Sequence, residues 1–274
     1  MIDRYKQNKI SSEIGIPMPR RGESDRDYAY RMIEEVTELL KNYAECTGKK
    51  GYVCHITGGV DSFVASMLIK RAGLFLASLS LPYGKKTDMV DVEMARNIIQ
   101  PDVFKVHDIT KTVDECIELL KDLPPTKVHI GNTKARIRMT VLYRVAEVYD
   151  LLVAGSVNAT ELTMGMITKH GDYAADIQPL AGITKGIIYE MAKIFGAPQS
   201  IINKLPTAGL WDNMSNREEV STLNHQVCLY LRGDANFQED FESKIVGLNE
   251  KSQHKRHLPV TEKDSWWVRR KQIL

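Results

Sequence analysis

Hydrophobic residues along the chain follow two patterns: short continuous runs, and longer stretches with helical spacing. Continuous runs are typical of strands buried on both faces of a sheet, and helical spacing is typical of the helices that cover such a sheet. The continuous runs predict strands at residues 51–56, 74–81, 103–108 and 151–156. The helical stretches are residues 63–73, 87–100, 110–123, 132–150 and 184–198. This alternation predicts a parallel sheet in a doubly wound α/β fold.

Two of the predicted helices are long. Residues 25–46 have apolar positions at helical spacing, with Ser24 or Asp25 as the cap and Gly48 as the stop. The helix over residues 132–150 has an apolar face made of Ile137, Val141, Val145 and Val148. After residue 157 the pattern becomes helical and rich in loops, and no repeat or linker divides it. We therefore expect a single domain over residues 1–274.

Composition excludes several classes of protein. Lys and Arg number 37 against 35 for Asp and Glu, so the chain lacks the strong positive charge that holds nucleic acid. No stretch approaches the roughly 20 apolar residues that span a bilayer, and the N-terminus has no apolar signal region. The four cysteines form no C-x-x-C pair, so we expect buried thiols in a reducing, cytoplasmic setting.

A glycine-rich turn follows the first predicted strand. Thr57 to Ser62 has the sequence TGGVDS and opens a helix, the position where α/β proteins bind anions. Gly58 and Gly59 permit close approach of backbone amides to phosphate oxygens. The turn is not a Walker A loop, and Asp61 beside phosphates is best explained as a Mg²⁺ ligand. An ordinary strand-to-helix turn is the alternative.

Residues 155–185 bring a second set of polar side chains after the fourth predicted strand. Ser156 lies at the strand end, and Glu161 is placed to share a cation with Asp61. The segment also contains the charged residues Lys169, Asp176 and Lys185. Each charge taken alone, like Arg136 and Arg138 on the preceding helix, is better explained as a solvated surface residue. Their occurrence together favours a binding site for phosphate or carboxylate groups.

The motifs around these residues resemble those of ammonia-dependent NAD synthetases. TGGVDS, GNTKARIRM, GSVNATE, TKHGDYAAD, LPTAGL and HKRHLP occur in that family's order, within about residues 25–270. TGGVDS alone resembles the wider group of N-type ATP pyrophosphatases. The resemblance implies an adenine-nucleotide alpha-hydrolase-like fold. It also implies amidation of deamido-NAD by ammonia, through an adenylate, with ATP as co-substrate and Mg²⁺ as cofactor.

The resemblance also implies roles for individual residues. For ATP it implies His55, Ile56, Thr57, Gly58, Gly59, Val60, Asp61, Ser62, Ser156, Lys185 and Thr207. For deamido-NAD it implies Asn132, Arg136, Lys169, Asp176, His254 and Lys255. Asp61 and Glu161 would bind Mg²⁺, and Asp61, Lys185 and Asp176 would be catalytic. We hypothesise that Asp176 accepts or orients the surplus proton of ammonia. The resemblance further implies a homodimer, with residues 25–46 and 250–274 as the elements expected to close the dimer or the substrate site.

Several positions depart from the pattern of that family. His55 stands where a glycine is usual, and Val128 stands where an aromatic residue is usual. Residues 213–224 replace a stretch that is ordinarily acidic. These departures favour, as an alternative, a related amidoligase that acts on another carboxylate. A non-catalytic nucleotide-binding homologue is the other alternative, and a glutamine-dependent enzyme is not expected because it would need its own glutaminase domain.

Overall fold

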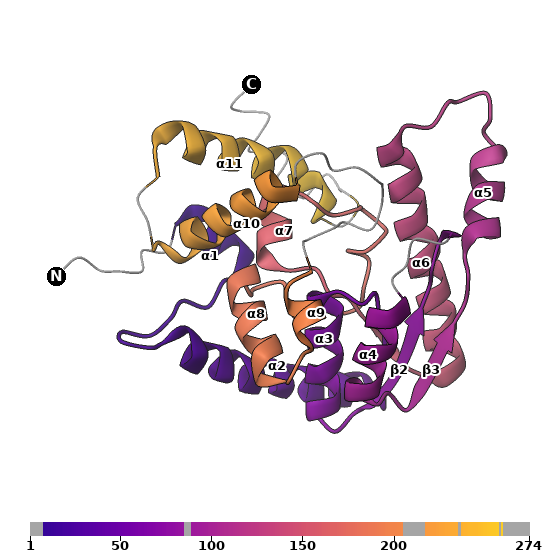
Figure 1. Cartoon of the computed structure of the whole chain (residues 1–274), viewed down its shortest axis with the longest axis horizontal. Coiled ribbons are helices and arrows are strands. Elements are labelled where there is room, and N and C mark those ends of the chain that lie inside the picture. The colour runs from indigo at the N-terminus through magenta and orange to yellow at the C-terminus, as the bar shows by residue number, and fades with distance from the viewer. Residues whose placement is uncertain (1–7, 85–88, 205–216, 235–236, 258, 260–274) are drawn as a thin grey trace.

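A four-stranded parallel sheet forms the centre of the computed structural model, which describes residues 8–84, 89–204, 217–234, 237–257 and 259 (Figure 1). The strands are β1 (Gly51–His55), β2 (Phe75–Ser80), β3 (Val103–Val106) and β4 (Leu152–Ala154). Their order across the sheet is β3-β2-β1-β4, and Val53 of β1 pairs with Ala77 of β2 and Val153 of β4. The predicted parallel α/β fold is confirmed.

The helices lie on both faces of this sheet and beyond its strand ends. Their bounds are α1 (Lys9–Ile14), α2 (Asp25–Thr47), α3 (Val60–Arg71), α4 (Met89–Ile99), α5 (Thr110–Glu118), α6 (Lys127–Tyr149), α7 (Ala159–Met164), α8 (Lys185–Ile194), α9 (Gln199–Ile202), α10 (Arg217–Arg232) and α11 (Glu239–Ser252), with a 3-10 turn at Gln253–Lys255. Figure 1 shows α5 and α6 on one side of the molecule, with α1, α10 and α11 on the other.

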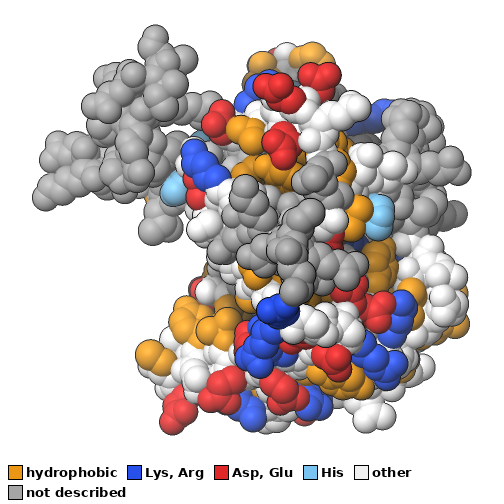
Figure 2. Space-filling view, turned by 90° about the vertical axis from the view of Figure 1, so that its left-hand side faces the viewer, with side chains coloured by type: hydrophobic (Ala, Val, Ile, Leu, Met, Phe, Trp, Pro, Cys, Tyr) orange, Lys and Arg blue, Asp and Glu red, His pale blue; other side chains and the backbone are white. Residues whose placement is uncertain are grey.

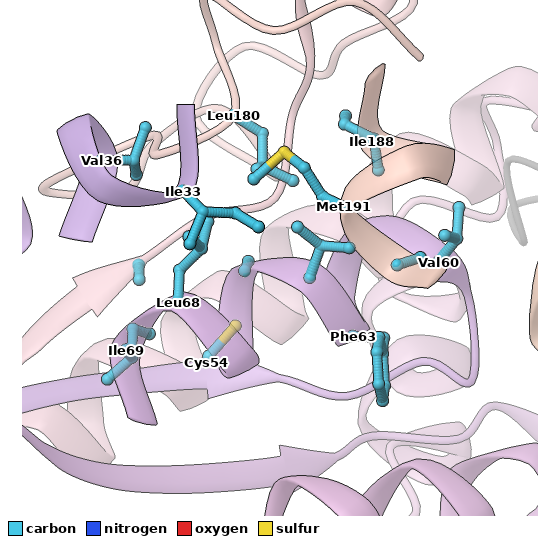
Figure 3. Close-up of a cluster of buried hydrophobic side chains, with 14 of the residues drawn as sticks. Ile33, Val36, Cys54, Val60, Phe63, Leu68, Ile69, Leu180, Ile188 and Met191 are labelled. Carbon is cyan, nitrogen blue, oxygen red and sulfur yellow. The ribbon is translucent and has the colours of Figure 1, made fainter. Parts of the chain in front are cut away.

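Alternate residues of β1 point into two separate cores, because successive side chains of a strand face opposite sides of a sheet. Tyr52 and Cys54 contribute to the larger core, where Figure 3 shows side chains such as Ile33 of α2, Leu68 of α3 and Met191 of α8. Val53 faces the second core, which α5 and α6 cover. A third cluster joins α1, α7, α10 and α11.

The structure corrects the limits of several predicted helices. The helix predicted from residue 63 begins at Val60, directly after the glycine turn. The helix predicted from residue 132 begins at Lys127, because Thr126 and His129 form a capping box there. The helix predicted to residue 123 ends at Glu118, and the helix predicted to residue 198 ends at Ile194. In addition, α10 and α11 were not predicted as separate helices.

Two predictions about burial were partly wrong. On α6 the buried apolar residues are Ala135, Met139, Leu142 and Ala146 rather than the predicted face, and Val148 is 62% exposed. The predicted face is offset because the second core meets α6 along the Met139 side, and Ile137, Val141 and Val145 flank it. All four cysteines are free thiols: Cys54 and Cys228 are buried, but Cys46 and Cys116 are exposed, since they lie on the outer sides of α2 and α5.

The surface gives no sign of a strongly charged face in the view of Figure 2, where acidic and basic side chains are interspersed. This mixture agrees with the near balance of charges in the sequence. Within the described residues, no helix combines the length and the apolar character needed to cross a bilayer.

Candidate active site

The strand order creates a place where a ligand is expected to bind, at the junction of β1 and β4. The chain passes from β1 to β2 and β3 on one side, and then returns to put β4 on the other side of β1. Loops that leave β1 and β4 therefore diverge at this point, and ligands of open α/β sheets bind at such a switch point, beyond the carboxyl ends of the strands. The glycine turn follows β1, and residues 155–161 follow β4.

The glycine turn is held by its own hydroxyl groups. The Ser62 hydroxyl accepts a hydrogen bond from the Thr57 amide at 3.2 Å and donates to the Gly59 carbonyl at 3.0 Å. The Gly59 amide donates to the Thr57 hydroxyl oxygen at 3.1 Å. These bonds fix the backbone of the turn at the N-terminus of α3, whose first-turn amides have no helical partners and suit an anion.

Gly58 brings this turn close to α4. Its φ angle is +73°, a left-handed conformation that favours glycine. A Cβ atom at Gly58 would lie 2.9 Å from the Cβ of Asp91 and 3.2 Å from the amide nitrogen of Val92. Asp91 is buried, and its carboxylate pairs with the Lys204 ammonium at 2.6 Å. The turn therefore packs against the start of α4 with no room for a side chain.

Four side chains from three helices meet beside the turn. Asp61 lies in the first turn of α3, Asn158 caps α7, Glu161 lies in the first turn of α7, and Lys185 begins α8. The Asn158 side-chain amide donates to Asp61 Oδ1 at 2.9 Å, and Lys185 Nζ forms an ion pair with Asp61 Oδ2. Side chains 97 and 124 residues apart from Asp61 in sequence are thus in contact with it.

The charged side chains of this cluster lie close together and are partly removed from water, which changes the pKa values of Glu161 and Lys185. Burial, followed by the nearby charge of Asp61, raises the pKa of Glu161 above its usual value. Burial by itself would lower the pKa of Lys185, but the carboxylates of Asp61 and Glu161 raise it overall, so the ammonium stays charged. One cation therefore faces two acidic groups in a partly desolvated place, an arrangement typical of functional sites.

A second group of predicted site residues surrounds the loop 165–178. Arg136 Nε donates to the Lys169 carbonyl at 3.2 Å, and Lys169 Nζ donates to the His254 carbonyl at 2.9 Å. Lys255 Nζ donates to the carbonyls of Gly165 and Ile167 at 2.9 and 3.0 Å. The side-chain oxygen of Asn132 accepts a bond from Thr168 at 2.8 Å. Helix α6, this loop and the segment after α11 are thus connected.

Asp176 is held at the edge of the sheet. Its Oδ2 accepts the backbone amide of Val153 in β4 at 2.7 Å, and its Oδ1 accepts the Tyr143 hydroxyl at 3.1 Å. Burial and the Asp176 carboxylate raise the pKa of Tyr143. Both carboxylate oxygens of Asp176 therefore have structural partners, and its catalytic role stays a prediction.

His55 ends β1 and contacts the segment after β2. Its Nε2 accepts the backbone amide of Leu81 at 3.3 Å, and Arg138 Nε donates to the Leu81 carbonyl at 3.0 Å. Burial, with a smaller contribution from Arg138, lowers the pKa of His55 to about 3, so its imidazole is neutral at physiological pH. Ser156 is the second residue after β4. The backbone amides on either side of it donate to the Ile177 carbonyl and to the side-chain oxygen of Gln178. Thr207 lies outside the described residues.

The sequence interpretation missed three residues of this region, Asn158, Asp91 and Lys204. Asn158 was detectable as a helix cap, because Asn-x-x-Glu is a capping-box pattern. Its bond to Asp61 was not, since it joins two helices far apart in sequence. The pairing of Asp91 with Lys204 had no local signal either.

A parallel α/β sheet with a glycine turn and an acid–lysine cluster at its switch point is typical of enzymes with the adenine-nucleotide alpha-hydrolase-like fold. A model of the NAD synthase family matches residues 32–259. The chain belongs to that family. The predictions of the fold, of the family and of a ligase that forms carbon–nitrogen bonds are confirmed, and the predicted ammonia-dependent reaction is confirmed at the level of the family.

Particular relatives agree with this assignment. The chain is similar to the NH3-dependent NAD+ synthetase of Tropheryma whipplei, with 35% identity over 250 residues that cover 86% of this chain and 92% of the relative. It also resembles the solved structure of NMN synthetase from Francisella tularensis, with 28% identity, a TM-score of 0.79, and coverage of 86% and 99%. For NAD+ synthetase from Burkholderia pseudomallei the identity is 27%, the TM-score 0.70, and the coverage 92% and 96%.

Proposed function

We propose that this enzyme amidates the nicotinate carboxylate of deamido-NAD with ammonia, at the expense of ATP. A carboxylate oxygen attacks the α-phosphorus of ATP, an oxygen–phosphorus bond forms, and pyrophosphate leaves. Ammonia then attacks the carbonyl carbon, the carbon–nitrogen bond forms, AMP leaves with its oxygen, and the nitrogen gives up a proton. The contact of Asp61, Asn158, Glu161 and Lys185 beside the glycine turn is the observation that carries the proposal.

The chain's own groups support the first step by binding negative charge. The free amides at the start of α3 can hold phosphate oxygens, and the Lys185 ammonium would stabilise the charge that develops on the leaving pyrophosphate. Because both reactants are anions, bringing them together needs such donors and cations. Neutral ammonia is the nucleophile of the second step, so Asp176 is our candidate for the group that receives or orients its proton.

Asp61 and Glu161 fit a Mg²⁺ ion. Two carboxylates project from the first turns of two helices and share one neighbour, Asn158. Burial and then the nearby charge of Asp61 raise the pKa of Glu161, and a divalent cation would stabilise its ionised form. Mg²⁺ sites commonly combine one or two carboxylates with substrate phosphates. When bound, the ion would neutralise charge on the phosphates of ATP.

The acceptor could also be a smaller nicotinate compound, and one observation favours this second candidate. The structure of an NMN synthetase matches this chain with a higher TM-score than the NAD+ synthetase structure described above. A mononucleotide presents the same carboxylate without the AMP half.

We extend the proposal to a homodimer in the cytoplasm, with its contact at the turn after α5 rather than at residues 25–46 and 250–274. The turn after α5 exposes Leu119, Leu120 and Leu123 by 80%, 54% and 62%, and exposed apolar patches mark protein contacts. The free, exposed thiols Cys46 and Cys116 suit a reducing compartment. Light scattering on the wild type should give twice the mass of the chain, and the double variant Leu119→Lys/Leu123→Lys should give the mass of one. Val90→Lys, an exposed change on α4, is the control that should remain dimeric.

The function is tested by chromatography of the reaction products. The protein is incubated with Mg-ATP, ammonium and either deamido-NAD or nicotinate mononucleotide, and the amidated product, AMP and pyrophosphate are quantified. Equal amounts of NAD, AMP and pyrophosphate support the proposal, and Asp61→Ala should abolish all three. Product from the mononucleotide alone would establish the second candidate. ATP–pyrophosphate exchange with a different acid would indicate another amidoligase, and the absence of any exchange would indicate a non-catalytic nucleotide binder.

A further inference from the structure

Asn158 is bonded to both of the carboxylate residues in the site. Its side-chain oxygen accepts the backbone amide of Glu161 at 3.0 Å, and its own backbone amide donates to Glu161 Oε2 at 3.1 Å. Its side-chain nitrogen donates to Asp61 Oδ1 at 2.9 Å. The residue is fully buried, with 0% exposure. The two partners define the orientation of the amide, because its oxygen must face an N–H group and its nitrogen must face a carboxylate.

A helix cap does not need this second contact. Ser and Asp cap a helix about as well as Asn does, because only a side-chain oxygen is required. The extra nitrogen of Asn158 reaches across to α3 and holds Asp61. Since the amide group is planar and rigid, it fixes the Asp61 carboxylate relative to the first turn of α7, where Glu161 lies.

The Glu161 carboxylate is held by the same residue. The capping box holds its Oε2 on the Asn158 backbone amide, and its other oxygen can serve a cation. Lys185 approaches Asp61 on Oδ2, the oxygen that Asn158 does not use. Each carboxylate thus has one oxygen fixed by Asn158 and a second oxygen directed elsewhere.

We infer that Asn158 is a positioning residue, which sets the orientation of Asp61 and Glu161 as a pair before a divalent cation binds. This inference rests on the Mg²⁺ site of the proposed function. Its physical basis is that residues bonded to metal ligands reduce the freedom that the ligands would lose on binding, and their removal costs roughly 10- to 100-fold in metal affinity.

The test uses Asn158→Ser, which keeps a capping oxygen but cannot reach Asp61. The matched control is Asn8→Ser, because Asn8 caps α1 and its side-chain nitrogen likewise donates to a distant group, the Tyr230 carbonyl. Binding of Mn²⁺ is measured by electron paramagnetic resonance in the presence of α,β-methylene-ATP, which cannot be cleaved at the reacting bond. Thermal unfolding of each variant is recorded alongside.

Asn158→Ser should weaken Mn²⁺ binding by about 10-fold or more while its unfolding temperature stays close to that of Asn8→Ser. In turnover assays it should raise the Mg²⁺ concentration for half-maximal rate, and saturating Mg²⁺ should restore much of kcat, a split that loss of a cap alone would not produce. Asn158→Thr serves if the serine variant does not fold. Mn²⁺ affinity equal to wild type in a folded variant overturns the inference. If the wild type itself binds no Mn²⁺, or Asp61→Asn binds it unchanged, the proposed metal site is wrong and the inference with it.

Discussion

Replacing Gly58 by alanine should destabilise the protein through two separate costs. The φ angle of +73° costs an alanine about 1–2 kcal/mol, of which about 0.4–1 kcal/mol is recovered because alanine restricts the unfolded chain. The new methyl group would also lie 2.9 Å from the Asp91 Cβ and 3.2 Å from the Val92 amide. Forcing such a group into a packed region costs about 1–3 kcal/mol more.

The second cost can be isolated with Gly73→Ala. Gly73 follows α3 and has nearly the same φ angle, +71°, but a Cβ atom there would have nothing within 4 Å. Both variants therefore carry the conformational cost, and only Gly58→Ala carries the contact with α4. Unfolding in guanidinium chloride, followed by circular dichroism, should show Gly58→Ala to be less stable than Gly73→Ala by about 1–3 kcal/mol.

Heat denaturation offers an independent check of the same difference. At about 2–4 °C per kcal/mol for a chain of this size class, Gly58→Ala should melt several degrees below Gly73→Ala. It should also bind ATP more weakly, because relief of the contact moves the turn whose amides we propose as phosphate donors. Equal stabilities of the two variants would refute the close packing of the turn on α4, and equal ATP affinities would refute the role of the turn in phosphate binding.

Three further predictions concern other parts of the site. Asp176→Asn should fold, because an amide can still accept from the Val153 backbone and donate to the Tyr143 hydroxyl. Its rate of NAD formation should fall about 100-fold if the carboxylate accepts or orients the proton of ammonia, and an unaffected rate would remove that role. Lys255→Met should lower the free energy of unfolding by about 1–3 kcal/mol, because the carbonyls of Gly165 and Ile167 lose a charged donor. It should also raise KM for the acceptor more than KM for ATP, and unchanged stability and KM would contradict the prediction. Because the pKa of His55 is about 3 in the folded protein, its imidazole takes up a proton below about pH 6.5 only when the chain unfolds, and the free energy of unfolding should fall by at most about 1.4 kcal/mol per pH unit between pH 6.5 and 3. In acid denaturation His55→Gln should flatten this slope, and an identical slope would show that His55 is charged in the folded protein as well.

Local sequence determined the elements of the fold and several of their ends. The run Tyr52–Cys54 is apolar because the sheet is covered on both faces, and this pattern is visible without any structure. The caps Ser24 and Asn158 act on amides only three residues away, so sequence contains their whole signal. The limits of α5 and α6 were harder, since the leucines after Glu118 continue the helical spacing although they lie in an exposed turn.

Tertiary structure alone decided how the site is assembled. The sequence predicted Asp61, Glu161 and Lys185 as functional residues, but their contact depends on β4 lying next to β1, and several strand orders are compatible with the same hydrophobic pattern. The bond from Asn158 to Asp61 and the packing of Gly58 on α4 join segments that are far apart in the sequence, and no local pattern signals these contacts. Short-range interactions are encoded by neighbouring residues. Contacts between residues 97 or 124 positions apart arise only when the whole sheet has formed and the ends of β1 and β4 lie side by side.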